Sequence, residues 1–390
     1  MKRKALEGYR VIDFSSVVAG PWCTRLLADA GAEVIKIEPI GMGDVLRFTQ
    51  PIADGDSRVY AHFNCGKKNV CLDLKSSEGV DIAKRLIAAA DIVVENFRPG
   101  VMARLGLDYS HVSHDLPGLI YCSISGFGQT GALSQSPAYA PVVHALSGFD
   151  HVQSSVQEDA EMPLNSAVMV ADFLAATYAY GAIQTAVVAK ERFNQGAHVD
   201  VTLMESMMTM VAIQYMEAQW HDVVPTTVFK PVAGKDGNVM IPLVSYRNYQ
   251  VLFPLIQKDN WLTDVRFQTF EGVIAGRAEI LQTLSEWARD KTVAELLTLV
   301  QGAGLPCARY KSPGQVLDDD LFVQRGSFTE ISDGVGAFKI INAPFQFDGI
   351  DREAGSVVAR SGEHTDEMMK NLAGLNTTEI AGLRDTKVIA

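Results

Sequence analysis

One carboxylate stands alone in a long apolar stretch of the chain. The segment AVMVADFLAATYAYGAIQTAVVAK, residues 167–190, holds Asp172 near its start and no further charged side chain before Lys190. An unpaired carboxylate in a buried segment is costly, so Asp172 either has partners that satisfy it or has chemistry to perform. A carboxylate can act as a nucleophile in covalent catalysis. Taken by itself, however, an Asp at this place is more often the N-terminal cap of a helix.

Composition and charge narrow the classes of protein. The apolar segment is long enough for a membrane span, but Asp172, Gln184, Thr185 and its many small residues favour a buried helix of a soluble protein. The net charge of −12 argues against nucleic-acid or anionic membrane partners. No apolar run precedes the first strand-like segment, so a secretory signal is not expected.

Five scattered cysteines without C-x-x-C spacing fit free, mostly buried thiols in a reducing cytoplasm, and they argue against a structural zinc site. The sequence therefore predicts a cytoplasmic protein without a metal.

Strand and helix signals alternate through the first part of the chain. YRVIDF, EVIKIE, VCLDL, DIVVEN and LIYCSISGF resemble strands, and helical segments such as WCTRLLADAGA and SSEGVDIAKRLIAAA separate them. This alternation predicts an α/β fold with a Rossmann-like parallel sheet, whose ligands bind in loops at the carboxyl ends of the strands. The candidate loops are 15–21, 38–43, 96–100 and 125–131.

No dinucleotide fingerprint (G-x-G-x-x-G) follows the first strand, and no P-loop motif occurs. Gly20-Pro21 predicts only a tight turn into a helix, in which Gly20 allows a close approach of backbone or ligand.

The character of the sequence changes after about residue 225. A hairpin is predicted around Lys235-Asp236-Gly237, followed by helices, and FTEISDGVGAFKIINAPFQF predicts a second hairpin. We expect a large domain over 1–225, a smaller α+β domain over 226–325, and a C-terminal return to the large domain over 326–390.

Several long motifs resemble the family III CoA-transferases of the CaiB/BaiF type. They are VIDFSSVVAGPWCTRLLADAGAEVIKIEPIGMGD, FNCGKKNVCLDLKSSEG, DIVVENFRPGVMARLGLDY, LIYCSISGFGQTG and SGEHTDE, in the family's order and spacing. The family includes formyl-CoA transferase, carnitine CoA-transferase and α-methylacyl-CoA racemase. The resemblance runs from about residue 5 to the tail.

The resemblance implies a role for Asp172. The family's catalytic aspartate precedes a helix of small and apolar residues, which corresponds to ADFLAATYAYGAIQTAVVAK here. It attacks an acyl-CoA thioester to give a mixed aspartyl anhydride, followed by an aspartyl-CoA thioester. Exchange between two carboxylates and one thiol is nearly thermoneutral, so neither a metal nor ATP is needed. A helix N-terminus would keep the carboxylate ionised.

The resemblance also implies the contacts to coenzyme A, which is a substrate as its acyl thioester. Family positions map to Val17, Val18, Ala19, Leu72, Lys75, Asn96, Phe97, Arg98 and Arg104. Arginine binds phosphate with two parallel hydrogen bonds, whereas Lys75 would act as a point charge. Lys67 and Lys68 fit solvated surface charges and are not assigned to the site. Pro39 stands where formyl-CoA transferases carry a basic residue, so contacts to adenine or the 3′-phosphate are expected to differ.

The substrate pocket is less well defined by the sequence. Tyr139 matches a tyrosine in the active site of several relatives, and Tyr139-Ala140 replaces the His-Asp pair of the racemases, which weighs against racemisation. His144 lies outside that register and fits a hydrogen-bonded packing residue. VFKPVAGKDGN replaces the glycine-rich segment of formyl-CoA transferases. Lys230 and Arg247 fit either contacts to an acceptor carboxylate or surface charges.

These considerations predict an acyl-CoA:carboxylate CoA-transferase, with a CoA-thioester isomerase, racemase or intramolecular CoA-transferase as the alternative. A non-catalytic CoA-binding subunit is disfavoured by the presence of Asp172. The family fold further implies an interlocked homodimer, with a linker helix in 190–232 and a methionine-rich dimer core.

Overall fold

The computed structural model describes residues 4–53, 56–155, 162–220, 229–332, 336–346, 348 and 355–390. These residues form two compact units. The larger contains the described residues up to Ser155, from 162 to Ile213 and from Asp320 onward, and the smaller contains those between Gln214 and Asp319. The domain limits drawn from the sequence, at 225 and 325, stay predictions.

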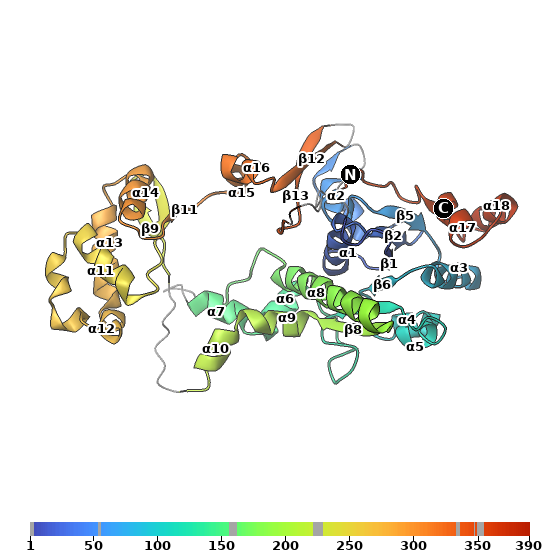
Figure 1. Cartoon of the computed structure of the whole chain (residues 1–390), viewed down its shortest axis with the longest axis horizontal. Helices are drawn as coiled ribbons and strands as arrows, with labels where there is room; N and C mark the ends of the chain where they lie inside the picture. The colour runs from blue at the N-terminus through green and yellow to red at the C-terminus, as the bar shows by residue number, and fades with distance from the viewer. Residues whose placement is uncertain are drawn as a thin grey trace. The chain divides into compact units, whose positions relative to one another are not determined.

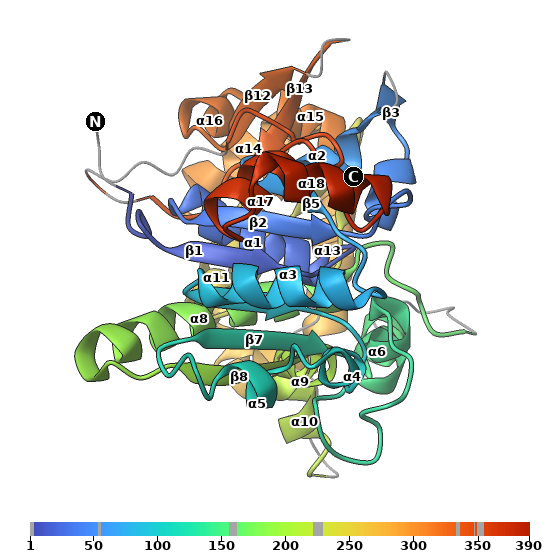
Figure 2. The same ribbon diagram turned by 90° about the vertical axis from the view of Figure 1, so that its right-hand side faces the viewer.

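A six-stranded parallel sheet forms the centre of the larger unit (Figures 1 and 2), as the sequence predicted. Its strands are β1 (Arg10–Asp13), β2 (Glu33–Glu38), β5 (Lys68–Cys71), β6 (Ile92–Glu95), β7 (Ile120–Ser125) and β8 (Ala197–Thr202). They lie in the order β5-β2-β1-β6-β7-β8, and every neighbouring pair is parallel. The order reverses between β1 and β6, and such a switch point is where open α/β sheets bind ligands.

Helices supply the apolar surfaces that bury the sheet. One core joins β-strand side chains to α3 (Ser77–Ala88), α17 (Thr365–Asn371) and α18 (Thr377–Asp385). The other helices that matter for the site are α1 (Ala19–Asp29) and α8 (Val170–Phe193), which pack against each other. Because both faces are covered, β6 and β7 are buried along their whole length.

The C-terminal segment returns to the larger unit, as predicted. Leu72, directly after β5, forms an antiparallel bridge with Ile389, and both side chains are buried. Strands β12 (Phe328–Ser332) and β13 (Ala337–Ile341) form the predicted second hairpin, whose turn at 333–335 lies outside the described residues.

Shorter elements complete the larger unit. They are β3 (Ile52–Ala53), β4 (Asp56–Ser57), η1 (Val45–Phe48), α2 (Arg58–Asn64), α4 (Val101–Leu105), α5 (Tyr109–Val112), α6 (Ala140–Leu146), α7 (Phe149–Ser155), α9 (Leu203–Met210) and α16 (Asp320–Gln324). Helix α10 (Ala212–Glu217) follows α9.

The apolar segment around Asp172 forms α8, which ends where Asn194 adopts a left-handed conformation (φ 52°). Alanines at Ala171, Ala175 and Ala179 are fully buried and allow close packing. Over the residues that the structure describes, none of the helices combines the length and hydropathy that crossing a bilayer demands.

The smaller unit has its own sheet and core. Strands β9 (Val232–Gly234) and β10 (Gly237–Met240) form the hairpin predicted around 235–237, and β11 (Ala308–Arg309) extends it. The helical elements are α11 (Tyr246–Leu255), η2 (Asp259–Leu262), η3 (Val265–Phe267), α12 (Phe270–Ala275), α13 (Arg277–Ala288), α14 (Val293–Gly302) and α15 (Pro313–Leu317). The core includes Tyr249, Phe253, Trp261 and Phe267.

The methionine-rich segment lies in α9 and α10. Met208, Met210 and Met216 are exposed on these helices, and residues 221–228 of the expected linker lie outside the described residues. The interlocked homodimer therefore stays a prediction.

Candidate active site

A pocket of about 270 Å³ lies where the chain leaves β1 and β6, at the switch point of the sheet. Asp172 lines this pocket together with residues from both loops. The two loops are tied to each other by one side chain: Asn96 Oδ1 accepts the Ser16 N–H at 2.9 Å, and Asn96 Nδ2 donates to the Ser16 carbonyl at 2.8 Å. The sheet topology thus brings the loop after β1 and the loop after β6 to one site.

Asp172 is not the cap of its helix. Met169 occupies the N-cap position of α8 without a side-chain hydrogen bond, and Asp172 is the third residue of the helix. The interpretation of Asp172 as a cap is therefore wrong. In the first turn, the carboxylate lies at the positive end of the helix dipole and can accept a hydrogen bond from its own N–H.

The N-terminus of a second helix, α1, also lines the pocket of Asp172. Ala19 is the first residue of α1, and its backbone N–H acts to lower the pKa of the Asp172 carboxylate. Burial raises the pKa of Asp172 from 3.8 to about 6, and the two backbone N–H groups act in the opposite direction. The carboxylate is therefore ionised at neutral pH yet poorly solvated, a condition that suits a nucleophile.

His144 holds the beginning of α8. Its Nε2 accepts the Ala171 N–H at 3.1 Å, so the ring proton is on Nδ1, and burial lowers the pKa of His144. The neutral imidazole thereby satisfies an amide of the first turn, one residue before Asp172. The predicted hydrogen-bonded packing role is confirmed, and its position next to Asp172 is what the sequence did not reveal.

Seven of the residues assigned from the sequence line this one pocket. They are Val17, Ala19, Asn96, Phe97, Arg98, Tyr139 and Asp172. Tyr139 is the N-cap of α6 and is 70% exposed, so its ring is free to contact a ligand. The pocket also contains hydroxyl groups that sequence reasoning missed, from Ser16, Ser125, Ser134 and Ser136. Ser16 and Ser125 lie in the candidate loops 15–21 and 125–131, whereas Ser134 and Ser136 lie outside every loop that the sequence indicated.

Four assigned residues do not line the pocket. Val18 is a buried N-cap of α1, and Leu72 belongs to the apolar core. Lys75 and Arg104 are exposed on the larger unit. In the smaller unit, Lys230 and Arg247 are exposed as well. The roles of all these residues in binding stay predictions.

Lys67 is a correction to the sequence-based interpretation. It is 4% exposed rather than solvated, and its ammonium group donates to Asp13 at 3.1 Å, Thr24 at 2.7 Å and Asn64 at 2.9 Å. Lys68 is partly exposed and pairs with Glu33 at 2.9 Å. Lys67 thus belongs to a buried charged network beneath the β1 loop.

Comparison with known proteins places this site in a family. The profile described as CoA-transferase family III matches residues 6–365. The chain belongs to this family.

Among curated relatives, succinyl-CoA:glutarate CoA-transferase of Mus musculus is 30% identical over 95% of this chain and 86% of its own. Succinate--glutarate CoA-transferase of Agrobacterium fabrum is 31% identical, with 83% of this chain and 84% of its own covered. Among solved structures, a hypothetical protein of Mycobacterium tuberculosis has a TM-score of 0.85 at 27% identity, covering 94% of this chain and 99% of that one. A CAIB/BAIF family protein of Brucella suis has a TM-score of 0.81 at 28% identity, covering 95% and 99%.

Proposed function

We propose that this chain is an acyl-CoA:carboxylate CoA-transferase in which Asp172 is the nucleophile. The observation that carries the proposal is the position of the Asp172 carboxylate, which lines the pocket at the switch point of the sheet and lies at the N-termini of both α1 and α8. Membership in CoA-transferase family III supports the same reaction class.

In the first half of the reaction, an Asp172 oxygen attacks the thioester carbonyl carbon of the acyl-CoA donor. The C–S bond breaks, CoA leaves as its thiolate, and a mixed anhydride forms between Asp172 and the acyl group. The thiolate then attacks the Asp172 carbonyl of the anhydride. This step releases the donor acid as a carboxylate and leaves Asp172 as a CoA thioester.

In the second half, the acceptor carboxylate attacks the aspartyl thioester and displaces the CoA thiolate, which gives a new anhydride. The thiolate attacks the acceptor's carbonyl, so the product acyl-CoA forms and the Asp172 carboxylate is regenerated. No net proton or electron is required. Each attack on carbonyl carbon places negative charge on an oxygen, and backbone N–H groups fixed at helix N-termini are suited to stabilise such charge.

The substrates we propose are small dicarboxylates and their CoA thioesters. Several relatives are named for the transfer of CoA between succinate and glutarate. Among the described residues that line the pocket, Arg98 is the one cationic side chain, and the serine hydroxyls and Asn96 add neutral donors and acceptors. Arg98 can bind a carboxylate or a phosphate with paired hydrogen bonds. It can therefore bind either the carboxylate of the acceptor or a phosphate of CoA.

The test is exchange of CoA between succinyl-CoA and a panel of mono- and dicarboxylates, followed by chromatography of the CoA thioesters. Incubation with donor and then hydroxylamine should convert Asp172 to a hydroxamate, which mass spectrometry detects in the peptide around α8. We expect both signals to be absent in Asp172→Ala. If Asp172→Ala still exchanges CoA and the native protein forms no hydroxamate, Asp172 is not the nucleophile.

We also propose the interlocked homodimer that the family resemblance implies. Light scattering on the eluting peak from a sizing column should give about twice the 42.4 kDa mass of one chain. A mass of one chain would contradict the dimer and leave the chemistry of Asp172 to be tested separately.

A further inference from the structure

The loop between β1 and α1 contains a strained residue. Val17 has φ 67°, in the left-handed region, which a β-branched side chain occupies only at a cost. Gly20, three residues after Val17, adds a second constraint, because a Cβ at Gly20 would lie 2.1 Å from Ser15 Cβ. The loop is therefore folded tightly back on itself immediately before Ala19.

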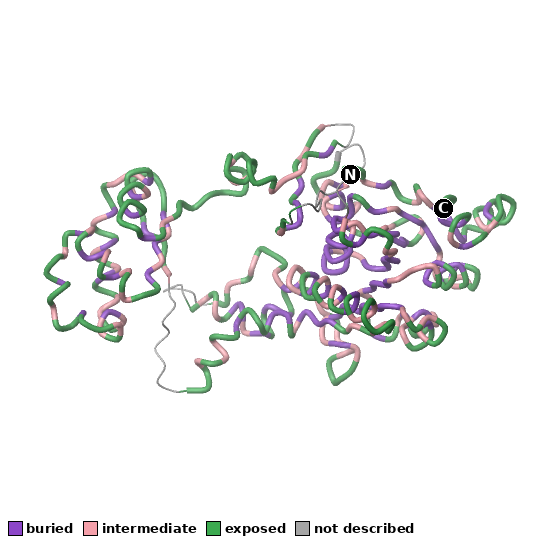
Figure 3. Tube along the Cα trace, viewed as in Figure 1, coloured by how far each residue is buried: buried purple, intermediate pink, exposed green. Residues whose placement is uncertain are grey.

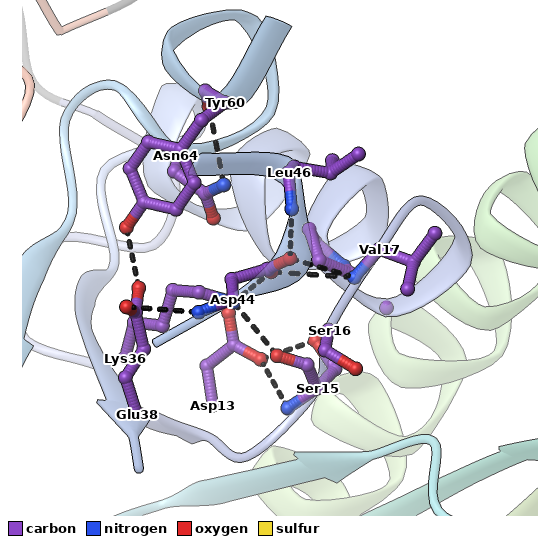
Figure 4. Close-up of polar contacts among 12 residues, drawn as sticks. Asp13, Ser15, Ser16, Val17, Lys36, Glu38, Asp44, Leu46, Tyr60 and Asn64 are labelled. Carbon is purple, nitrogen blue, oxygen red and sulfur yellow. Dashed lines mark hydrogen bonds and ion pairs between the residues drawn. The ribbon is translucent and has the colours of Figure 1, made fainter. Parts of the chain in front are cut away.

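One carboxylate holds Val17 in this conformation. The Val17 N–H donates to both oxygens of Asp44, at 3.2 and 3.3 Å. Asp44 is 2% exposed, and Lys36 lies on its other side with Nζ 3.0 Å from Asp44 Oδ2. Lys36 Nζ also donates to the Ser15 carbonyl at 2.7 Å. Figure 4 shows Asp44 at the centre of these contacts, between Lys36 and the backbone of the loop.

Asp44 is itself held in place by a hydrogen bond to a second carboxylate, Glu38. Its N–H donates to Glu38 Oε2 at 3.1 Å, and Arg47 binds both oxygens of Glu38 at 2.7 and 3.1 Å. The Tyr60 hydroxyl donates to Glu38 Oε1 at 2.6 Å. These groups come from the end of β2, from η1 with its cap and from α2, so a second set of elements fixes the loop after β1.

We propose that Asp44 is a positioning residue, which keeps Val17 left-handed so that the next turn presents the Ala19 N–H to Asp172. The inference rests on the proposed function, since it assigns a task to Asp44 in the reaction of Asp172. Asp44 does not line the pocket, and it acts only through the backbone of the loop.

Glycine at position 17 separates this role from a general effect on stability, because glycine adopts φ 67° without an anchor. We expect Asp44→Ala to lower kcat about 10- to 100-fold when Val17 is present, the loss typical of a misplaced catalytic group. In the Val17→Gly background, the same Asp44→Ala change should lower kcat less than about threefold. The acidic limb of the pH profile should also move to higher pH in Asp44→Ala, because Asp172 loses a hydrogen bond that favours its ionised form.

Equal losses from Asp44→Ala in both backgrounds would overturn the proposal. If Asp44→Ala does not fold, Asp44→Asn in the same two backgrounds decides, since Asn keeps one acceptor for the Val17 N–H. With Val17 present, Asp44→Asn should lower kcat less than Asp44→Ala does. In the Val17→Gly background, Asp44→Asn should lower kcat no further, and an equal loss of kcat in both backgrounds counts against the proposal. Asp264→Ala is the matched control, because Asp264 caps the 3-10 turn η3 as Asp44 caps η1, but in the smaller unit. It should leave kcat unchanged.

A structural readout makes the outcome independent of activity. Crystal structures should show φ of residue 17 near +67° in the native protein and in the Asp44→Ala/Val17→Gly double variant, and negative in Asp44→Ala. A left-handed Val17 in Asp44→Ala would overturn the positioning role. Absence of CoA transfer by the native protein would instead refute the proposed function and leave this conformational result standing.

Discussion

The two units of this chain differ in the kinds of side chain that they bury, and Figure 3 shows that both contain buried residues. Every buried polar or charged side chain among the described residues belongs to the larger unit, including Asp13, Lys36, Asp44 and Lys67. The described part of 214–319 buries apolar and aromatic side chains instead, among them Phe253. The larger unit therefore adds buried, paired charges around a site to its apolar core, whereas the smaller unit is held by apolar packing.

This difference has a physical reason. Apolar packing is strong but does not orient a particular backbone group, whereas a buried charge with several hydrogen bonds is confined to one arrangement. The larger unit uses such groups under the β1 loop, where the position of the Ala19 N–H matters. Removing these charged groups should therefore alter both the rate of CoA transfer and the dependence of stability on acid pH. Removing an apolar side chain from the core of the smaller unit should lower stability equally at every pH.

The largest effect is expected at the carboxylate. Asp172→Ala should lower CoA transfer on the order of 10³-fold or more, because the covalent route is lost. In the native protein, kcat/KM should fall as the pH drops through about 6, where Asp172 takes up a proton and ceases to be a nucleophile. Steady-state assays from pH 4.5 to 8.5 measure both. A flat profile would contradict the assigned pKa.

Breaking the buried network should cost stability. Asp13→Ala leaves Lys67 without its carboxylate, and we expect a loss of about 3–5 kcal/mol in the free energy of unfolding. Two buried ammonium groups lower the pKa of Asp13 to about 2, so its contribution is complete above pH 4 and disappears as the pH falls toward 2. The matched change in the smaller unit, Leu252→Ala, should cost about 2–5 kcal/mol at every pH. Urea titrations at pH 3 and 7 distinguish the two.

Removing the charge of Asp172 should stabilise the inactive protein. Because its folded pKa of about 6 lies above the unfolded value, the folded state resists ionisation, and stability declines as the pH rises from 4 to 6. At pH 7.5 the free energy of unfolding of Asp172→Asn should therefore exceed that of the native protein by about 3 kcal/mol, and below pH 4 the two should not differ. An equal gain at both pH values would point to packing rather than charge.

A smaller effect is expected at His144. His144→Leu removes the acceptor of the Ala171 N–H and should lower kcat about tenfold, or about 1–2 kcal/mol. His144→Gln keeps an acceptor oxygen and should restore most of the rate with little change in KM. If both variants lose activity equally, the hydrogen bond to Ala171 is not what matters.

The smallest effect is expected on the surface of the smaller unit. Arg266 pairs with Asp264 and Glu279 in solvent. Exposed pairs contribute little, so Arg266→Ala should leave both the melting temperature and CoA transfer within error of the native values. A clear drop in activity would mean that this surface has a role in the reaction.

The sequence predicted the sheet, the position of the loops and the carboxylate because these follow from local patterns. Strands of the β1 type are apolar runs, and the helix around Asp172 is a long run of small residues. Strand β8, by contrast, was missed, since AHVDVT is short and half polar and is defined only by pairing with β7. Lys67 was misjudged for a related reason: its three side-chain partners come from β1, α1 and α2. The contact of His144 with Ala171 spans 27 positions and has no motif.

The bridge between Leu72 and Ile389 has a consequence for synthesis of the protein. The ribosome adds about 5–20 residues per second, so tens of seconds separate the emergence of these two partners. During that interval the apolar face that α17 and α18 will cover is exposed to the cytosol of any cell that makes the chain. A segment made more than three hundred residues after β1 thus completes the core that β1 begins, and we expect chaperones to engage the nascent chain until then.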